Sequence, residues 1–147
     1  MTGFHVSVGE TARFTKTVGE SDVYLFAGIT GDFAPNHVDK TYMQRSRFGR
    51  LQAHGALLVG FMSTTAGIVA GRTRASCSEE TAVSLGYDRI RFTAPVFLGD
   101  TITVDYRLVA IDPARRRATA EIEIKNQEDV LVGVGTHILA WISNREA

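Results

Sequence analysis

The first third of the chain passes from a strand pattern to a helix pattern and then to a loop. Apolar and polar residues alternate over residues 12–18, which predicts a strand. Apolar residues then recur at helical spacing over residues 20–30, where Gly19 is an acceptable cap and Gly31 stops the helix. Residues 32–37 follow neither pattern, so we expect a loop there.

Two further helices are expected after this loop. Asp39 stands where it can cap a short helix that continues to about Arg45. This helix is expected to carry Tyr42 and Met43 inward. Residues 54–70 are apolar nearly all round, and a helix of that kind is buried on most sides. We therefore expect the longer helix to form the centre of the fold.

The rest of the chain has strand patterns separated by turn residues. The turns are marked by Pro95, Gly99-Asp100, Asp112-Pro113 and residues 127–129. The strands are predicted over residues 82–92, 101–111, 117–126 and 130–142. Short connections between successive strands imply antiparallel pairing. The pattern predicts an α+β fold in which a strongly bent antiparallel sheet follows a buried helix.

The size and composition of the chain are those of one soluble globular domain. Its 147 residues match a single domain spanning 1–147, with 44% hydrophobic and 22% charged residues. The 16 basic and 16 acidic residues cancel, whereas nucleic-acid-binding domains usually carry a basic excess. We therefore expect no nucleic-acid partner.

Two features bear on where the protein works. The first residues include neither a basic nor an apolar leader segment, and the one cysteine, Cys77, cannot form an internal disulfide. Both observations fit a reducing compartment. The longest apolar stretch, residues 55–70, is interrupted by polar residues and is too short for a typical membrane span. We expect a cytoplasmic protein with no membrane partner.

The loop at residues 30–37 combines an acid, a base, a glycine and a proline. Asp32 and His37 are five residues apart, so a rigid loop can hold a carboxylate and an imidazole across a small substrate. Pro35 fixes one backbone angle, and Gly31 permits a conformation that other residues resist. Taken without its surroundings, such a pair is more often a turn cap and a partly buried polar residue.

No metal site is expected from the spacing of the remaining histidines. His5 and His137 have no acidic or cysteine partner at a metal-ligand spacing. The loop pair can supply fixed acid–base geometry without a metal.

Three segments form a combined pattern: TGDFAPNH at residues 30–37, AHG at residues 53–55 and YDRIRF at residues 87–92. This pattern resembles the MaoC-like dehydratases, also called (R)-specific enoyl-CoA hydratases, a family with the hot-dog fold. Two positions depart from the family's pattern, because Ala34 replaces the usual asparagine and Asn36 the usual aliphatic residue. The first departure removes an amide that supports the loop.

The resemblance implies an antiparallel sheet wrapped around a long central helix. It also implies a homodimer or dimer of dimers, in which two sheets join edge to edge. The implied reaction is the reversible addition of water to a trans-2-enoyl-CoA, which gives an (R)-3-hydroxyacyl-CoA. No cofactor is expected, because coenzyme A belongs to the acyl-CoA substrate.

The resemblance assigns roles to residues of both motifs. Asp32 takes a proton from the attacking water, while His37 orients that water and helps to deliver a proton to the α-carbon. Gly31, Pro35 and His54 are expected to support this pair.

Gly55 and two arginines are the candidates for binding the thioester. Gly55 opens the long helix, where its N–H has no partner within the helix and lies at the positive end of the helix dipole. It therefore suits the thioester carbonyl and the enolate. Arg89 and Arg91 are candidates for contacts to the coenzyme A phosphates. Residues 63–65 either line an acyl pocket or hydrogen-bond back to their own helix.

Two other functions stay open. A thioesterase on the same fold also uses a carboxylate and a helix N-terminus, but it releases free coenzyme A. A non-catalytic acyl-CoA-binding subunit is the second alternative, and Ala34 is the feature that motivates it.

Overall fold

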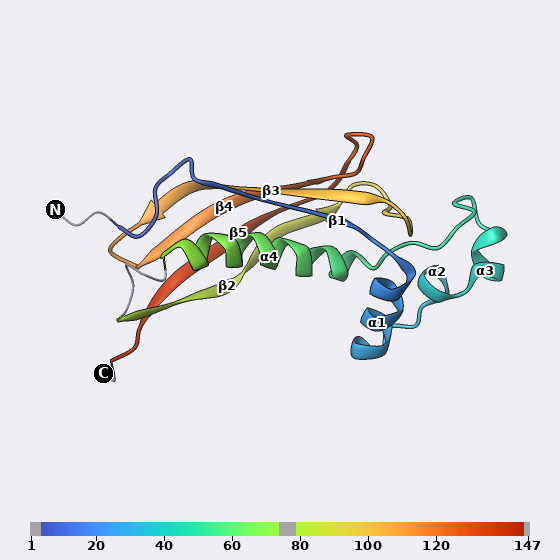
Figure 1. Ribbon diagram of the computed structural model, residues 1–147, viewed down its shortest axis with the longest axis horizontal. Coiled ribbons are helices and arrows are strands. Elements are labelled where there is room, and N and C mark those ends of the chain that lie inside the picture. The colour runs from blue at the N-terminus through green and yellow to red at the C-terminus, as the bar shows by residue number, and fades with distance from the viewer. Residues whose placement is uncertain (1–3, 74–78, 146–147) are drawn as a thin grey trace.

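One antiparallel sheet with the strand order β1-β3-β4-β5-β2 lies over the long helix α4 (Figure 1). The computed structural model describes residues 4–73 and 79–145. The strands are β1 Thr11–Thr17, β2 Glu80–Phe92, β3 Thr101–Asp112, β4 Arg117–Lys125 and β5 Leu131–Ser143. The helices are α1 Glu20–Thr30, α2 Pro35–Val38, α3 Lys40–Gln44 and α4 Gly55–Thr73. The α+β arrangement agrees with the sequence-based expectation.

The predicted strands are confirmed, but one predicted pairing is wrong. β3, β4 and β5 pair in succession, whereas β2 pairs with β5 and lies at the opposite edge of the sheet from β1. Residues 93–100 carry the chain across the end of the sheet. Within them Gly99, at a φ of 96°, donates its N–H to the carbonyl of Val18 at 2.7 Å. The chain therefore enters β3 beside β1 and does not turn back along β2.

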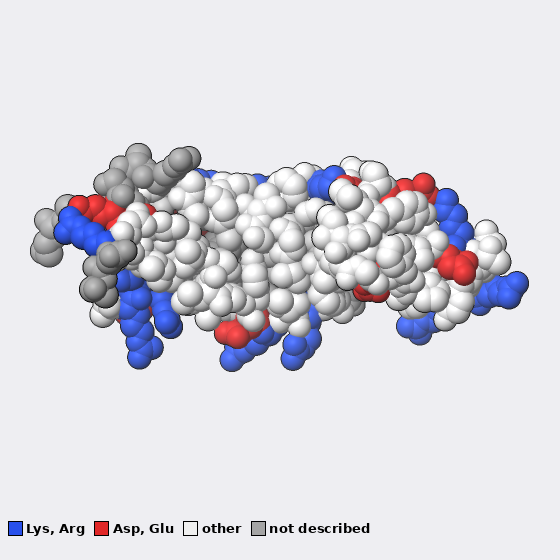
Figure 2. Space-filling model, turned by 90° about the horizontal axis from the view of Figure 1, so that it is seen from below, with Lys and Arg blue, Asp and Glu red and all other residues white. Residues whose placement is uncertain are grey.

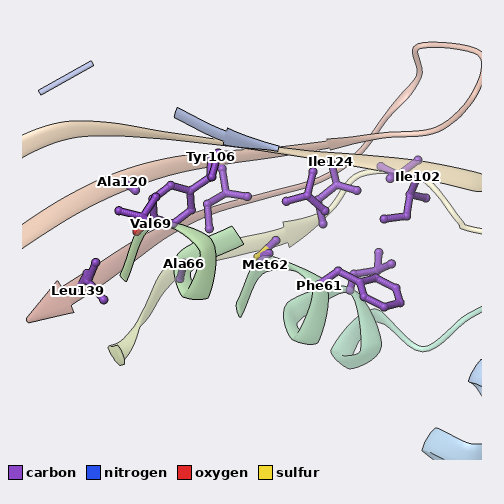
Figure 3. Packing of buried hydrophobic residues seen from close by; sticks show 14 of the residues in the cluster. Phe61, Met62, Ala66, Val69, Ile102, Tyr106, Ala120, Ile124 and Leu139 are labelled. Atoms are coloured by element: carbon purple, nitrogen blue, oxygen red, sulfur yellow. The ribbon is translucent and has the colours of Figure 1, made fainter. Parts of the chain in front are cut away.

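Alternation along the central strands separates a core side from a solvent side. The buried residues of β3 and β4 are Ile102, Val104, Tyr106, Leu108, Ala118, Ala120, Ile122 and Ile124. On α4, the buried Phe61, Met62, Ala66 and Val69 belong to the same core (Figure 3). Each large apolar side chain buried here stabilises the fold by about 1.5–3 kcal/mol, so this layer holds α4 against the sheet.

The side of α4 that faces away from the sheet is exposed in the single chain. Its exposed residues include Ala56, Gly60, Ser63, Thr64, Gly67 and Gly71. The prediction that this helix is buried on most sides is therefore wrong for the single chain. A view from this side shows a wide central area without charged residues (Figure 2). By length and composition α4 can cross a membrane, but its seven buried residues pack against the core.

Helices α1, α2 and α3 form a group beyond the N-terminal end of α4 (Figure 1). At the start of α1 the carboxylate of Asp22 accepts a hydrogen bond from the N–H of Gly19 at 2.9 Å. At its end Gly31, with a φ of 80°, donates to the carbonyl of Ala27 at 2.8 Å. The predicted cap and the predicted stop are both confirmed.

Two details of this group differ from the prediction. Residues 35–38 form the helix α2, so the second half of the predicted loop is helical, because proline suits the first turn of a helix. Asp39 caps α3 as expected and accepts a hydrogen bond from the N–H of Tyr42 at 2.9 Å. Met43 is buried, but Tyr42 is 56% exposed, since this five-residue helix turns only one side inward.

Candidate active site

Backbone hydrogen bonds place the start of α4 beside α2. Gln52 donates its N–H to the carbonyl of Asn36 at 2.9 Å. Ala53 donates its N–H to the carbonyl of Val96 at 2.7 Å. The segment before α4 therefore runs between α2 and the connection from β2 to β3, which brings the two sequence motifs together.

Asp32, His37 and His54 converge at this place. One nitrogen or oxygen atom from each side chain lies within 4.8 Å of the corresponding atoms of the other two. Both imidazoles are buried, whereas Asp32 is exposed. The rings of His37 and His54 stack with their centroids 3.7 Å apart, and the ring of Phe26 lies 4.8 Å from that of His54. The structure thus brings the predicted acid, the predicted base and one predicted supporting residue together.

A backbone carbonyl determines which nitrogen of His37 is free. Its Nδ1 lies 2.8 Å from the carbonyl oxygen of Gln52. A carbonyl only accepts hydrogen bonds, so Nδ1 carries the hydrogen and Nε2 of the neutral ring keeps a lone pair.

His54 donates its hydrogen bond from the other ring nitrogen, Nε2. Its Nε2 lies 3.0 Å from the carbonyl oxygen of Asp32, so Nε2 donates and the lone pair is on Nδ1. This Nδ1 is buried and has no hydrogen-bond partner within residues 4–73 and 79–145. The three side chains therefore offer two imidazole lone pairs and a carboxylate.

The backbone of the loop orients the carboxylate of Asp32. Its Oδ1 accepts a hydrogen bond from the N–H of Ala34 at 3.2 Å, and its own N–H donates to Oγ1 of Thr30 at 3.3 Å. The donor at position 34 is a main-chain group, so this contact does not need the asparagine side chain that the family pattern has there. Gly31 and Pro35 bound the loop by ending α1 and starting α2.

Gly55 is the first residue of α4, as predicted. Its N–H therefore has no acceptor within the helix and lies at the positive end of the helix dipole. The ring of Phe92 lies so close that a Cβ on Gly55 would be 2.4 Å from Cε2 of Phe92. A side chain at position 55 would therefore displace the Phe92 ring, which is half-exposed and packs beside the helix start.

The two predicted phosphate-binding arginines have different surroundings. Arg89 lines a groove of about 460 Å³ together with Arg107 and the carboxylates Asp105, Glu121 and Glu123. Asp105 is paired with Arg13, and Glu121 with Arg107. These carboxylates alternate along β3 and β4 with core residues, so the groove lies on the side of the sheet away from α4. Arg91 is exposed and precedes Phe92 in the chain. The groove lies away from the start of α4, whereas Arg91 precedes the Phe92 that lies against Gly55, so Arg91 is the better placed of the two.

A third arginine, Arg50, lies close to Gln52. The guanidinium of Arg50 lies 3.9 Å from the centre of the Phe97 ring, and Phe97 forms a β-bridge with Gln52. Arg50 also lines a hollow of about 230 Å³ with Lys40 and Gln44. Lys40 is already paired with a carboxylate at 2.6 Å, whereas the described residues place no carboxylate in an ion pair with Arg50.

His137 is engaged in a buried network away from the loop. Its Nε2 lies 2.8 Å from Oγ of Ser84, and its Nδ1 lies 2.9 Å from the hydroxyl of Tyr106. Burial lowers the pKa of His137 to about 4 and raises the pKa of Tyr106. His137 is therefore neutral near pH 7, with both nitrogens paired.

The remaining candidates have structural partners. Nε2 of His5 lies 2.5 Å from Oε2 of Glu80. A hydrogen bond from Arg116 lowers the pKa of Glu80. In α4 the hydroxyls of Thr64 and Thr65 donate to carbonyls of their own helix at 3.3 and 2.7 Å. Of the two expected roles, an acyl-pocket lining or a bond back to the helix, these contacts are the second. Cys77 lies outside the described residues.

Sequence reasoning missed two groups of this site. The carbonyl of Gln52 sets the tautomer of His37, and a main-chain atom leaves no signal in the residue type. The contact of Phe92 with Gly55 was also missed. Phe92 is the last residue of the third segment of the family pattern. That segment was the available signal for Phe92, but only the fold brings its last residue to the start of α4.

Comparison with known proteins identifies the family. The MaoC like domain matches residues 4–130, so the chain belongs to this family. It is 35% identical over 114 residues to an (R)-specific enoyl-CoA hydratase of Rhodospirillum rubrum, covering 78% of this chain and 74% of that protein.

Solved structures identify the fold. The (R)-hydratase from A. caviae involved in PHA biosynthesis has a TM-score of 0.77 at 28% identity, over 92% of this chain and 96% of that one. A hot-dog-like protein from Thermanaerovibrio acidaminovorans has a TM-score of 0.67 at 16% identity, over 95% and 86% of the two chains. The chain therefore has the hot-dog fold, and the fold prediction is confirmed.

Proposed function

We propose that this protein catalyses the reversible addition of water to a trans-2-enoyl-CoA, which gives an (R)-3-hydroxyacyl-CoA. It is then a hydro-lyase that acts as an enoyl-CoA hydratase in one direction and as a 3-hydroxyacyl-CoA dehydratase in the other. The observation that carries the proposal is the Asp32 carboxylate close to the His37 ring, whose Nδ1 is bound to a carbonyl so that Nε2 keeps its lone pair. Relatives named (R)-specific enoyl-CoA hydratase and 3-hydroxybutyryl-CoA dehydratase support it.

The two acceptors suit one water molecule. A water that donates two hydrogen bonds of about 2.8 Å bridges acceptors up to about 5.6 Å apart. One carboxylate oxygen of Asp32 and one ring nitrogen of His37 lie within 4.8 Å of each other. With both hydrogens held, the oxygen lone pairs are free to attack the β-carbon. One proton of the water passes to the pair and a proton from the pair reaches the α-carbon, so the pair ends in its starting state.

Charge develops on the thioester oxygen as the β-carbon is attacked. The N–H of Gly55 at the start of α4 is the donor that stabilises this enolate. The ring of Phe92 beside Gly55 shields that oxygen from water. No cofactor is needed, because the only coenzyme in the reaction is the coenzyme A of the substrate.

The phosphates of coenzyme A need cations near the start of α4. Arg50 and Arg91 are our candidates, because Arg50 stacks on Phe97 beside the Gln52 segment and Arg91 precedes Phe92. A guanidinium that carries no carboxylate partner is available for a bidentate contact with phosphate.

A homodimer, alone or as half of a dimer of dimers, completes the proposal. β2 has 13 residues at an edge of the sheet, where an uncovered strand of this length is a pairing site. The uncharged side of α4 is also open (Figure 2). A second copy covers both features, because a two-fold axis places the same edge against itself.

The outer side of α4 supplies the test of the dimer. A Cβ added at Gly67 meets no atom within 4 Å in the single chain, so Gly67→Leu fits the subunit but obstructs a closely packed partner. Light scattering should report a dimer for the unchanged protein and a monomer for the variant. An unchanged protein that is monomeric contradicts this part of the proposal.

The reaction is tested with purified protein and trans-2-enoyl-CoA substrates of several chain lengths. Hydration removes the conjugated thioester absorbance without releasing a thiol, and chiral analysis should identify the (R)-3-hydroxyacyl product. Release of free coenzyme A would identify a thioesterase instead. Binding of a saturated acyl-CoA without turnover of any enoyl-CoA would identify a non-catalytic subunit.

A further inference from the structure

We propose that Asp32, His37 and His54 also bind a divalent transition-metal ion such as Zn²⁺, and that the ion inhibits the enzyme by occupying the place of the reacting water. The binding of the ion follows from the three side chains alone. Its inhibitory effect rests on the proposed hydration activity.

The first argument is an excess of acceptors. Both imidazoles donate their one hydrogen to a backbone carbonyl, and the Asp32 carboxylate has no hydrogen to give. The three side chains therefore present acceptors only. One water has two hydrogens and satisfies two of them, which leaves a third acceptor over. Nδ1 of His54, buried and without a partner among the described residues, is such a group.

The second argument is the chemistry of the donor set. Two neutral imidazole nitrogens and one carboxylate suit Zn²⁺, Co²⁺, Ni²⁺ and Cu²⁺, whereas Mg²⁺ and Ca²⁺ prefer oxygen ligands. Each imidazole already donates its other nitrogen to a carbonyl, at 2.8 Å for His37 and 3.0 Å for His54. This outer contact orients the ring and keeps the correct nitrogen deprotonated for a metal.

The three side chains must move slightly closer together to bind an ion. Ligands at about 2.0–2.2 Å from Zn²⁺ lie about 3.2–3.6 Å from one another in a tetrahedral site. In the structure one ring nitrogen of each histidine and one carboxylate oxygen of Asp32 lie within 4.8 Å of one another. The contraction falls mainly on Asp32, because its carboxylate is exposed while the two stacked rings are buried. Three protein ligands leave a further position to solvent, as in open metal sites.

An ion at this site inhibits because it takes the lone pairs that hydration needs. Asp32 and His37 cannot accept hydrogen bonds from the reacting water while they are ligands. Metal binding and hydration are therefore mutually exclusive uses of the same acceptors.

Binding is tested with Co²⁺, whose visible absorption reports its coordination. The protein carries His5→Gln and Cys77→Ser, which remove a histidine beside Glu80 and the one cysteine of the sequence. We expect one equivalent of Co²⁺ to bind and Zn²⁺ to displace it, while Mg²⁺ has no effect. Absence of Co²⁺ binding overturns the proposal.

Two variants on this background locate the site. His54→Gln and Asp32→Asn should each weaken Co²⁺ binding by about 10- to 100-fold or more, the range seen even for outer-contact changes at metal sites. Asp32 is exposed, so Asp32→Asn keeps the proposal testable if His54→Gln does not fold. Unchanged Co²⁺ binding in Asp32→Asn places the ion elsewhere and overturns the proposal.

Turnover separates this proposal from the proposed function. Zn²⁺ should abolish enoyl-CoA hydration, and a chelator should restore it. Hydration that persists at Zn²⁺ concentrations that saturate the Co²⁺ site overturns the inhibitory role while the hydratase function stands. Site-specific binding in a protein without hydratase activity refutes the proposed function and supports the metal site.

Discussion

Two clusters that contain histidine differ in whether the ring nitrogens all have hydrogen-bond partners. Near the start of α4, His37 and His54 each donate a hydrogen bond from one ring nitrogen to a backbone carbonyl. The other nitrogen of each ring keeps its lone pair, and the exposed Asp32 lies beside them. On the inner side of the sheet, both nitrogens of His137 are paired with hydroxyls, those of Ser84 and Tyr106. The first cluster can accept a proton or a ligand, and the second has no acceptor left.

The difference teaches how to separate a reactive histidine from a structural one. Burial lowers the pKa of His137 to about 4 and so stabilises its neutral ring. A free lone pair next to an exposed carboxylate instead leaves His37 available to a water from solvent. Burial alone does not separate the two, because both rings are buried. What separates them is whether the second ring nitrogen has a hydrogen-bond partner.

The largest expected effect breaks the reactive cluster. Asp32→Asn and His37→Ala should each reduce enoyl-CoA hydration by about 100-fold or more, because each removes an acceptor of the same water. The double variant should be impaired to a similar extent, since the two residues act as a unit. The measurement is kcat for the three variants, with binding of a saturated acyl-CoA as the control for folding. Losses that multiply in the double variant would mean two independent roles.

The second prediction concerns the structural cluster. The unfolded chain binds a proton at His137 below pH 6.5, whereas the folded protein does so only near pH 4. The free energy of unfolding should therefore fall as the pH drops through this window, by up to about 3 kcal/mol from this group.

His137→Gln is the matched control for this pH dependence. It keeps a polar side chain beside the two hydroxyls but cannot titrate. Denaturant unfolding of both proteins at several pH values between 4 and 6.5 makes the comparison, and the variant should lack the part of the slope that belongs to His137. Equal slopes would show that burial does not hold this ring neutral.

A smaller effect tests which cations extend the reactive site. Arg50→Ala should raise KM for the enoyl-CoA by about tenfold, which corresponds to one charge-assisted hydrogen bond of roughly 1.5 kcal/mol. Arg89→Ala is the matched control, because Arg89 lines a groove on the side of the sheet away from α4. An increase in KM for Arg89→Ala but not for Arg50→Ala would reverse this assignment.

The smallest expected effect concerns the support of Asp32. Because the N–H of residue 34 already holds Oδ1 of Asp32, Ala34→Asn should change kcat by less than about twofold, as surface changes away from buried partners do. Steady-state kinetics of this one variant is sufficient. A large loss would show that the loop has repacked around alanine.

The sequence by itself determined the elements and the chemistry-bearing loop. Side-chain periods of two and of about 3.6 residues are local properties, so the strands and helices α1 and α4 were predicted within a few residues. The acid and the base lie on one short loop, and Gly31 and Pro35 shape it by restricting or freeing single backbone angles. These features depend on neighbours in the chain.

Tertiary structure alone decided the strand partners and the state of the site. β2 pairs with β5 and not with its successor β3, because residues 93–100 cross the end of the sheet and enter β3 beside β1. The free nitrogens of His37 and His54 are set by carbonyls of Gln52 and Asp32, 15 and 22 residues away. Every residue has a backbone carbonyl, so the residue type does not predict which imidazole a given carbonyl will bind.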